Sequence, residues 1–316
     1  MRTAFAVFAL MGVVSSAHAT VDIMTALDNV RTSCGGISAE LNQMKTMAGI
    51  GTGVSAAGAL AGGAAVATGV IKSNVDEQNK NAISIRAAWN KFTGGTKIEL
   101  SDTVKKLFLD DMEEWAAQNP KLAKDLQKMR QDSALGQKSE KLGNIRTGAL
   151  AAATVTGAAG AVVGGMNMKK ARGTLTEQVS ECLASVKELS TAYGQERITR
   201  SVSEQELEQI NTIISACDEW STVDLSKIDN RATGAMASGT ASAAMGLVGT
   251  VTSAMANTDK MRFSGTKKEE NLNKASNIMA GGTAVASTAA TIFNATQLSA
   301  LKRASTVADA CEGALN

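Results

Sequence analysis

Residues 47–71 read MAGIGTGVSAAGALAGGAAVATGVI, a stretch that is rich in glycine and alanine and contains no charged side chain. Small residues recur in it at strict four-residue spacing: Gly49, Gly53, Ala57, Ala61, Ala65 and Gly69. On a helix this spacing gives a nearly straight stripe with little side chain above the backbone. Such a stripe lets another helix approach closely, as small-xxx-small motifs do in membranes. We therefore expect these six residues to form a helix-packing surface.

Three further stretches of the same kind follow, at residues 147–168, 232–258 and 275–301. A charged insert with helical patterns, residues 73–146, separates the first two stretches, and a short charged turn, residues 259–274, separates the last two. The chain of 316 residues holds six phenylalanines, three tryptophans, one tyrosine and one proline. Because sheet proteins are richer in aromatic and β-branched residues, this composition predicts an all-α fold.

Residues 1–19, MRTAFAVFALMGVVSSAHA, combine one arginine, an apolar run and the terminal sequence Ala17-His18-Ala19. These are the parts of a secretory signal peptide, so we expect export and a mature chain that starts at Thr20. The alternative is a retained membrane helix, although the apolar run is shorter than the ~20 residues that a span requires. Cleavage would remove the sole histidine, so we expect no catalytic residue, no cofactor and no metal site.

Several helix ends can be predicted from local sequence. Gly35 and the glycine after it are expected to interrupt the first helix, and Asn119 followed by Pro120 is typical of a helix start. Two pairs have the spacing of a capping box, Thr174 with Glu177 and Ser203 with Glu206. We expect a helix to begin at each box, the second being an amphipathic helix over residues 203–220.

The cysteines suggest an internal duplication into a first half, residues 20–182, and a second half, residues 183–316. Each half reads cysteine, small-residue helix, small-residue helix, cysteine. If each helix pair is an antiparallel hairpin, both cysteines of a half arrive at the same end of it. In an oxidising compartment this arrangement predicts the disulfides Cys34–Cys182 and Cys217–Cys311, one of three connectivities. The alternative is that the cysteines are small buried hydrophobic residues.

Two interpretations of the small-residue stretches remain open at this point. Each stretch is long enough to cross a hydrocarbon core of ~30 Å, but each is poor in the leucine, isoleucine, phenylalanine and valine that favour insertion. The net charge of +2 and the lack of a nucleotide-binding motif point to no nucleic acid and no small-molecule substrate. We predict an exported, non-enzymatic protein that packs or self-associates through glycine-zipper helices at or in a membrane of the cell envelope. The alternative is a soluble periplasmic or secreted bundle with a structural or adaptor role.

Overall fold

The computed structural model describes residues 22–93, 111, 114–199 and 203–316, and the predicted signal peptide lies outside this part of the chain. The described residues form helices and turns without a strand among them, which confirms the all-α prediction. The chain divides into two compact units that each draw on both halves of the sequence. Of the described residues, unit 1 comprises those within 1–38, 176–223 and 305–316, and unit 2 comprises those within 39–175 and 224–304.

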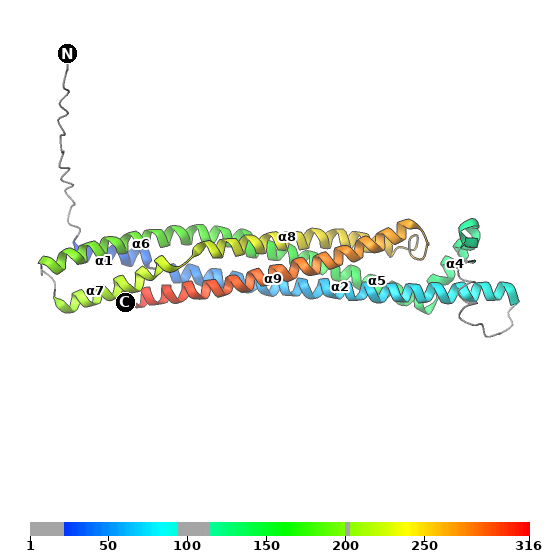
Figure 1. Ribbon diagram of the computed structural model, residues 1–316, viewed down its shortest axis with the longest axis horizontal. Helices are drawn as coiled ribbons and strands as arrows, with labels where there is room; N and C mark the ends of the chain where they lie inside the picture. The colour runs from blue at the N-terminus through cyan, green and yellow to red at the C-terminus, as the bar shows by residue number, and fades with distance from the viewer. Residues whose placement is uncertain (1–21, 94–110, 112–113, 200–202) are drawn as a thin grey trace, which may run out of the picture. The chain divides into compact units, whose positions relative to one another are not determined.

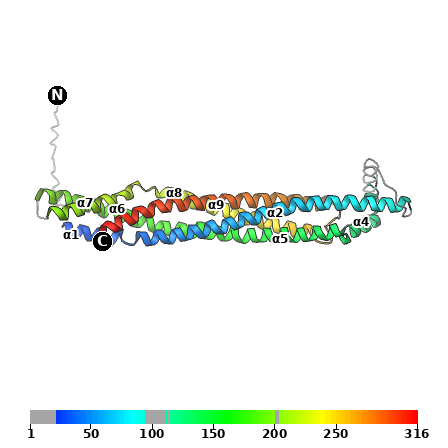
Figure 2. The same ribbon diagram turned by 90° about the horizontal axis from the view of Figure 1, so that it is seen from below.

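The main part of unit 2 is a bundle in which four long helices lie side by side in both views (Figure 1 and Figure 2). They belong to α2 (Ile37–Thr93), α5 (Ala134–Ala161), α8 (Leu225–Ala256) and α9 (Lys267–Leu315). A π-helical turn, η1 (Val162–Asn167), joins α5 to α6 (Met168–Thr199). The four small-residue stretches of the sequence fall within these helices, except for the end of the third, which reaches into the turn after α8.

Close contacts at glycines fix the directions of these helices. A Cβ atom built on Gly58 of α2 would lie 2.8 Å from the Thr156 Oγ1 atom of α5 and 3.1 Å from the Ser287 Oγ atom of α9. Further along α2, Gly69 lies against Arg146 and Asn277. As the residue numbers of α2 rise, those of the residues it contacts on α5 and α9 fall, so α2 runs antiparallel to both helices.

The same reasoning places α8 antiparallel to its two neighbours. A Cβ atom on Gly157 of α5 would lie 3.0 Å from the Ser242 Oγ atom, and one on Gly249 of α8 would lie 3.1 Å from both Leu150 and Met279 side-chain atoms. Ser242 also forms a 2.6 Å hydroxyl hydrogen bond with Ser287 of α9. Each of the four helices α2, α5, α8 and α9 therefore has two antiparallel neighbours.

The buried positions of these helices follow a heptad pattern, in which spacings of three and four residues alternate. This is the pattern of a left-handed coiled-coil bundle, whose contact line repeats every 3.5 residues. In α2 the buried positions between residues 41 and 72 are Leu41, Met44, Ala48, Gly51, Ser55, Gly58, Gly62, Ala65, Gly69 and Lys72; in α9 of unit 2 they include Ser276, Ala280, Thr283, Ser287, Ala290, Asn294, Gln297, Leu301 and Ala304.

The expected four-residue stripe of α2 is not the contact line within the chain. Ala65 and Gly69 are buried, Ala61 is half-buried, and Gly49, Gly53 and Ala57 are exposed. Four residues turn a helix through about 400°, so a strict four-residue row drifts by about 40° at each step. It therefore crosses the buried heptad line and does not follow it.

Most predicted helix ends are found in the structure. The first helix, α1 (Ile23–Cys34), ends at Gly35, and Gly36 adopts a φ of 90°, which favours glycine. α4 (Pro120–Asp132) begins with Pro120 in its first turn, and the Asn119 side chain accepts two backbone N–H bonds there.

Of the two predicted capping boxes, only the second caps a helix. Ser203 and Glu206 form both bonds of the box at the start of α7 (Glu204–Asp218), which a short 3₁₀ turn, η2 (Glu219–Thr222), extends. The expectation of a helix start at Thr174 is wrong, because α6 runs without interruption from Met168 to Thr199. A cap satisfies N–H groups that have no helical acceptor, and the residues around Thr174 have acceptors in the preceding turn.

Unit 1 is built from α1, the larger part of α6, α7, η2 and the last turns of α9. In contrast to the bundle, its buried side chains are mainly large and apolar, and they include Val30, Val186, Leu189, Ile213 and Trp220. A side-chain contact between distant segments adds to this core: the Ser38 N–H and hydroxyl groups donate to the Glu312 carboxylate, at 3.1 and 2.6 Å.

Candidate functional site

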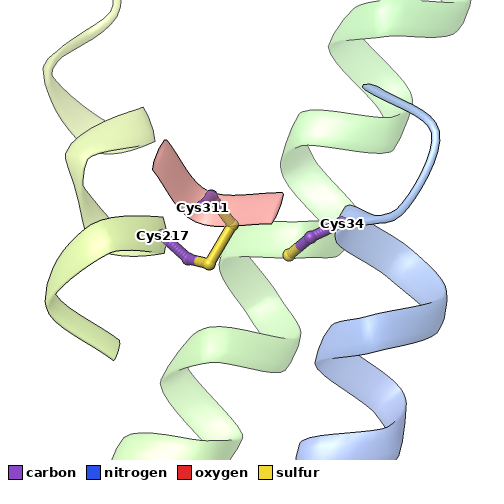
Figure 3. A group of neighbouring side chains, drawn as sticks. All are labelled: Cys34, Cys217 and Cys311. Atoms are coloured by element: carbon purple, nitrogen blue, oxygen red, sulfur yellow. A yellow bond between two sulfur atoms is a disulfide. The ribbon is translucent and has the colours of Figure 1, made fainter. Parts of the chain in front are cut away.

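Four helices of unit 1 contribute one cysteine each to a buried sulfur cluster. Cys34 ends α1, Cys182 lies on α6, Cys217 on α7 and Cys311 on α9, and all four are at most 1% exposed. Figure 3 shows the Cys217–Cys311 disulfide with Cys34 pointing toward it. The Sγ atoms of these three residues lie within 4.8 Å of one another.

The structure contains the two disulfides that the sequence spacing predicts, Cys34–Cys182 and Cys217–Cys311. They join residues 148 and 94 positions apart, so they tie distant helices to one point. All four sulfurs are held in these bonds. A metal would need free thiolates, so the disulfide form of this cluster offers a metal no ligands.

The interior of the unit 2 bundle is small and polar. At its centre, Gly58 of α2, Thr156 of α5, Ser242 of α8 and Ser287 of α9 meet in one layer, which we call the central layer. One large apolar side chain lies nearby: Leu150 is fully buried and packs in a cluster with two alanines, one from α2 and one from α9. Small side chains at these positions let the helix backbones approach closely, and they contribute little apolar area themselves.

Asn294 on α9 places an amide in this interior. It is fully buried, and glycines on two other helices make room for it: Cβ atoms on Gly51 and Gly164 would lie 3.1 and 2.7 Å from its Oδ1 atom. Its Nδ2 atom donates to the Ser55 hydroxyl at 3.4 Å, and its Oδ1 atom has no hydrogen-bond partner. Gly164 belongs to η1, so the π-helical turn lies directly opposite the amide. Such turns are frequent at functional sites.

One turn further along α9, Gln297 is also fully buried, and neither atom of its amide has a protein partner. A buried amide without partners is unfavourable by about 1 to 3 kcal/mol. In membrane bundles, buried polar side chains of this type either hold helices together or mark functional positions.

Toward the end of the bundle that carries the charged insert, Arg146 of α5 marks where charge begins. Its side chain is buried, and its Nη2 atom donates to the Asn277 Oδ1 atom of α9 at 2.6 Å. Gly69 of α2 makes room for both groups. Lys72, one turn beyond Gly69, is buried and forms an ion pair with Asp76 on its own helix.

The outer faces of the same four helices carry large apolar side chains. We call this set the apolar belt: Ile50, Leu60, Val70 and Ile71 on α2; Ile145, Val155 and Val162 at α5 and η1; Leu247, Val248, Val251 and Met255 on α8; and Ile278, Val285, Ile292 and Phe293 on α9. Leu60, Val155 and Val285 are 78%, 68% and 71% exposed. Ordinary soluble bundles show the opposite arrangement, because their large apolar residues face inward.

Exposed hydroxyl groups on these faces hydrogen-bond within their own helix. Thr68, Thr240, Thr252 and Thr288 each donate to the backbone carbonyl four residues earlier, at 2.8 or 2.9 Å. Threonines in transmembrane helices satisfy their hydroxyls by this back-bonding. The outer faces of the bundle therefore present little unsatisfied polarity.

Charged residues are absent from one common layer of the four helices. From the central layer the nearest charge in one direction is Arg146, ten residues from Thr156, and in the other direction Arg231, eleven residues from Ser242. At 1.5 Å per residue, the layer between the levels of Arg146 and Arg231 is about 30 Å thick. We call it the charge-free layer. The hydrocarbon core of a bilayer has the same thickness, ~30 Å.

Length and composition alone identify two helical segments as able to cross a membrane, Ile23–Ser84 and Ala134–Gly165. Only 28% and 39% of their most apolar windows is buried, whereas the core helix of a soluble protein, which passes the same test, is mostly buried. α8 and α9 are long enough but are not among these candidates.

Comparison of the chain with protein-family models, curated proteins and solved structures found no match. The features that the sequence reasoning missed, the buried amides and the apolar belt, are both set by the heptad register. Their sequence signal was the alternating three- and four-residue spacing of small and polar residues, which continues through Asn294 and Gln297.

Proposed function

We propose that unit 2 is a four-helix bundle that spans a membrane, and that the protein is an exported, non-enzymatic component of the cell envelope anchored by this bundle. One observation carries the proposal: a charge-free layer about 30 Å thick has small polar residues inside and large aliphatic residues outside.

Lipid is a better partner for the apolar belt than another protein. A docking site for one partner occupies one face, whereas the belt includes outward residues from all four helices, such as Leu60, Val155, Leu247 and Val285. In water these side chains would remain unfavourably exposed, by about 25 cal/mol for each Å² of apolar surface. In a bilayer the same surface is solvated by acyl chains.

Packing in such a bundle would depend on small residues, because lipid removes the hydrophobic driving force between helices. The close glycine contacts of α2 with α9 and of α5 with α8 supply this packing within one chain. The exposed small residues Gly49, Gly53 and Ala57 remain available for a glycine-zipper contact between copies. We therefore propose self-association through the outer face of α2.

We also propose that the two halves are duplicated hairpins, α2 with α5 and α8 with α9. Each pair is antiparallel, and each half is closed by its own disulfide. The chain passes between the units at residues 38/39, 175/176, 223/224 and 304/305, which all follow the same end of the charge-free layer along the helices; we call this end the cysteine side because the chain leads from it to all four cysteines. This side would face the oxidising compartment.

The alternative function is that of a soluble periplasmic or secreted bundle with a structural role. The modest apolarity of α8 and α9 favours it, because neither helix qualifies as a span on composition. The two functions make opposite predictions for a charge placed at the centre of the belt.

The discriminating experiment is Leu60→Arg, close to the central layer. In a soluble bundle this exposed residue has helix propensity equal to that of arginine, so stability should change by less than about 0.5 kcal/mol. In a membrane the change should disfavour insertion by about 3 to 4 kcal/mol. Ile198→Arg is the matched control, since Ile198 is 83% exposed on α6 in unit 1.

We expect the wild type and Ile198→Arg to remain in the membrane pellet after alkaline carbonate extraction and Leu60→Arg to be depleted from it. Recovery of all three proteins in the soluble fraction, with equal melting temperatures, would refute the membrane proposal and favour the soluble bundle.

A further inference from the structure

Basic side chains gather at one end of the charge-free layer, the end on the cysteine side. They come from α2, α8 and α9 and from α6, which continues α5 beyond η1. We call them the basic collar: Lys45 on α2, Lys169 and Arg172 on α6, Arg231 on α8, and Lys302 and Arg303 on α9. Counted along its own helix, each collar residue lies within about two to three helical turns of the level of Asn294. Lys169, Lys302 and Arg303 are exposed.

Few acidic residues lie among the collar residues in the sequence. Asp229 pairs with Arg172 at 2.6 Å, and it is the acidic residue that lies among the collar residues of α8. The six collar residues and Asp229 together carry a formal charge of +5, from 6 − 1. Arg231 additionally donates to the Thr296 carbonyl of α9, which holds its guanidinium at the surface of the bundle.

The opposite end of the layer has a different charge pattern. Its basic residues alternate with acids, and three of them form ion pairs with acids: Lys72 with Asp76, Arg262 with Glu140, and Lys274 with Glu270. These ion pairs offset part of the basic charge at that end. Relative to its basic residues, the collar therefore has fewer acids than the opposite end of the belt.

We propose that the basic collar binds the phosphate groups of anionic phospholipids in the leaflet on the cysteine side. This inference rests on the proposed membrane function, because the collar faces headgroups only if the belt lies in acyl chains. Lysine and arginine at a membrane surface attract anionic lipid by about 1 kcal/mol each, which is about fivefold per charge. Guanidinium groups such as that of Arg303 also bind phosphate in bidentate fashion.

The test compares retained lipids on the full-length protein, released in mild detergent with equal amounts of phosphatidylglycerol and phosphatidylcholine. Native mass spectrometry counts the molecules of each lipid that stay bound. The collar variant is K169Q/K302Q/R303Q, which changes exposed residues. The matched control, K138Q/K141Q/K267Q, removes three charges at the opposite end, and K169R/K302R/R303K keeps the collar charge.

We expect the wild type to retain phosphatidylglycerol at least tenfold better than phosphatidylcholine at low salt, and to lose this preference at about 0.5 M salt because of screening. The collar variant should lose the preference, while the control and the charge-retaining variant keep it. An equal preference for phosphatidylglycerol in the collar variant and the control would refute the proposal that the collar binds anionic lipid. A protein that is extracted by carbonate and retains neither lipid would instead show that the membrane proposal itself fails.

Discussion

Replacing Gly62 by alanine should destabilise unit 2, although the same replacement at the adjacent Gly63 should stabilise it. A Cβ atom on Gly62 would lie 2.8 Å from the Ala284 Cα atom and 2.9 Å from the Ala284 N atom, both in the backbone of α9. Backbone cannot rotate away as a flexible side chain can, so α2 and α9 would have to separate. A Cβ atom on Gly63 would meet nothing within 4 Å.

Two effects set the magnitudes. Alanine favours a helix over glycine by about 0.8 to 1 kcal/mol, and this gain is common to both variants. Added volume in a tight contact typically opposes folding by about 1 to 3 kcal/mol, and this penalty applies to Gly62→Ala alone. The difference between the two variants therefore isolates the contact, at about 1 to 3 kcal/mol.

A difference of this size corresponds to roughly 2 to 12 °C in melting temperature for a unit of about 200 residues. We would measure it as the temperature at which half of the full-length protein is lost from its size-exclusion peak, an assay that works in buffer and in detergent. Gly157→Ala and Gly148→Ala form a second matched pair, because Gly157 lies against the Ala243 backbone and Gly148 has open space. A melting temperature for Gly62→Ala equal to or above that of Gly63→Ala would refute the close α2–α9 contact.

Three further predictions concern single groups. Asn294→Leu should leave the melting temperature unchanged or raise it by a few degrees, because the buried Oδ1 atom has no partner to lose; a fall of more than about 2 kcal/mol in stability would show that the amide has a role not seen in the single chain. Serine at both Cys217 and Cys311 should lower the free energy of unfolding by about 2 to 5 kcal/mol in chemical denaturation, and an unchanged midpoint would contradict this. Hydrogen bonds from Ser203 lower the pKa of Glu206 below its ordinary 4.5, so the cap stabilises α7 at neutral pH and is lost as the pH falls through the lowered pKa. Protection of the first α7 amides, measured as their exchange rate relative to the intrinsic rate at the same pH, should fall on acidification in the wild type and depend less on pH in Glu206→Gln.

Local features of this fold could be predicted from the sequence because a few neighbouring residues determine them. The break at Gly35-Gly36, the Asn119 cap and the Ser203 box each depend on a single turn of chain. The Thr174 box has the same spacing and yet caps nothing, since only the preceding backbone decides whether a turn begins there. The disulfide pairing was predictable because it followed from chain direction and not from side-chain detail.

The contact line of α2 could not be predicted from the strict four-residue stripe, because the partners of a helix determine which of its rows is buried. Glycine and alanine occupy nearly every row of residues 47–71, so several rows look equally suited to close packing. Gly53 and Ser55 illustrate the ambiguity: the glycine is exposed, and the serine is buried and donates to the Gly51 carbonyl at 2.6 Å. Only the positions of α5 and α9 resolve it.

The difference between the inner and outer faces of these helices explains why composition left the membrane question open. In α9 the inner face is polar, with Ser276, Thr283, Ser287, Asn294 and Gln297, whereas the outer face holds the aliphatic residues of the belt. Hydropathy averaged along a helix mixes these two faces, so a helix with a polar interior scores below a span even when its lipid-facing row is fully apolar. For a helix that packs inside a bundle, insertion depends on the outer face, because the inner face never meets acyl chains once the bundle has formed. α8 and α9 should therefore insert poorly alone and well in the presence of α2 and α5.

Expressing residues 224–316 without the first half should yield a fragment that carbonate extracts, and co-expression with residues 1–182 should return it to the membrane pellet. A fragment that inserts equally well alone would show that its average hydropathy suffices, and that the polar inner face of α9 does not hinder insertion.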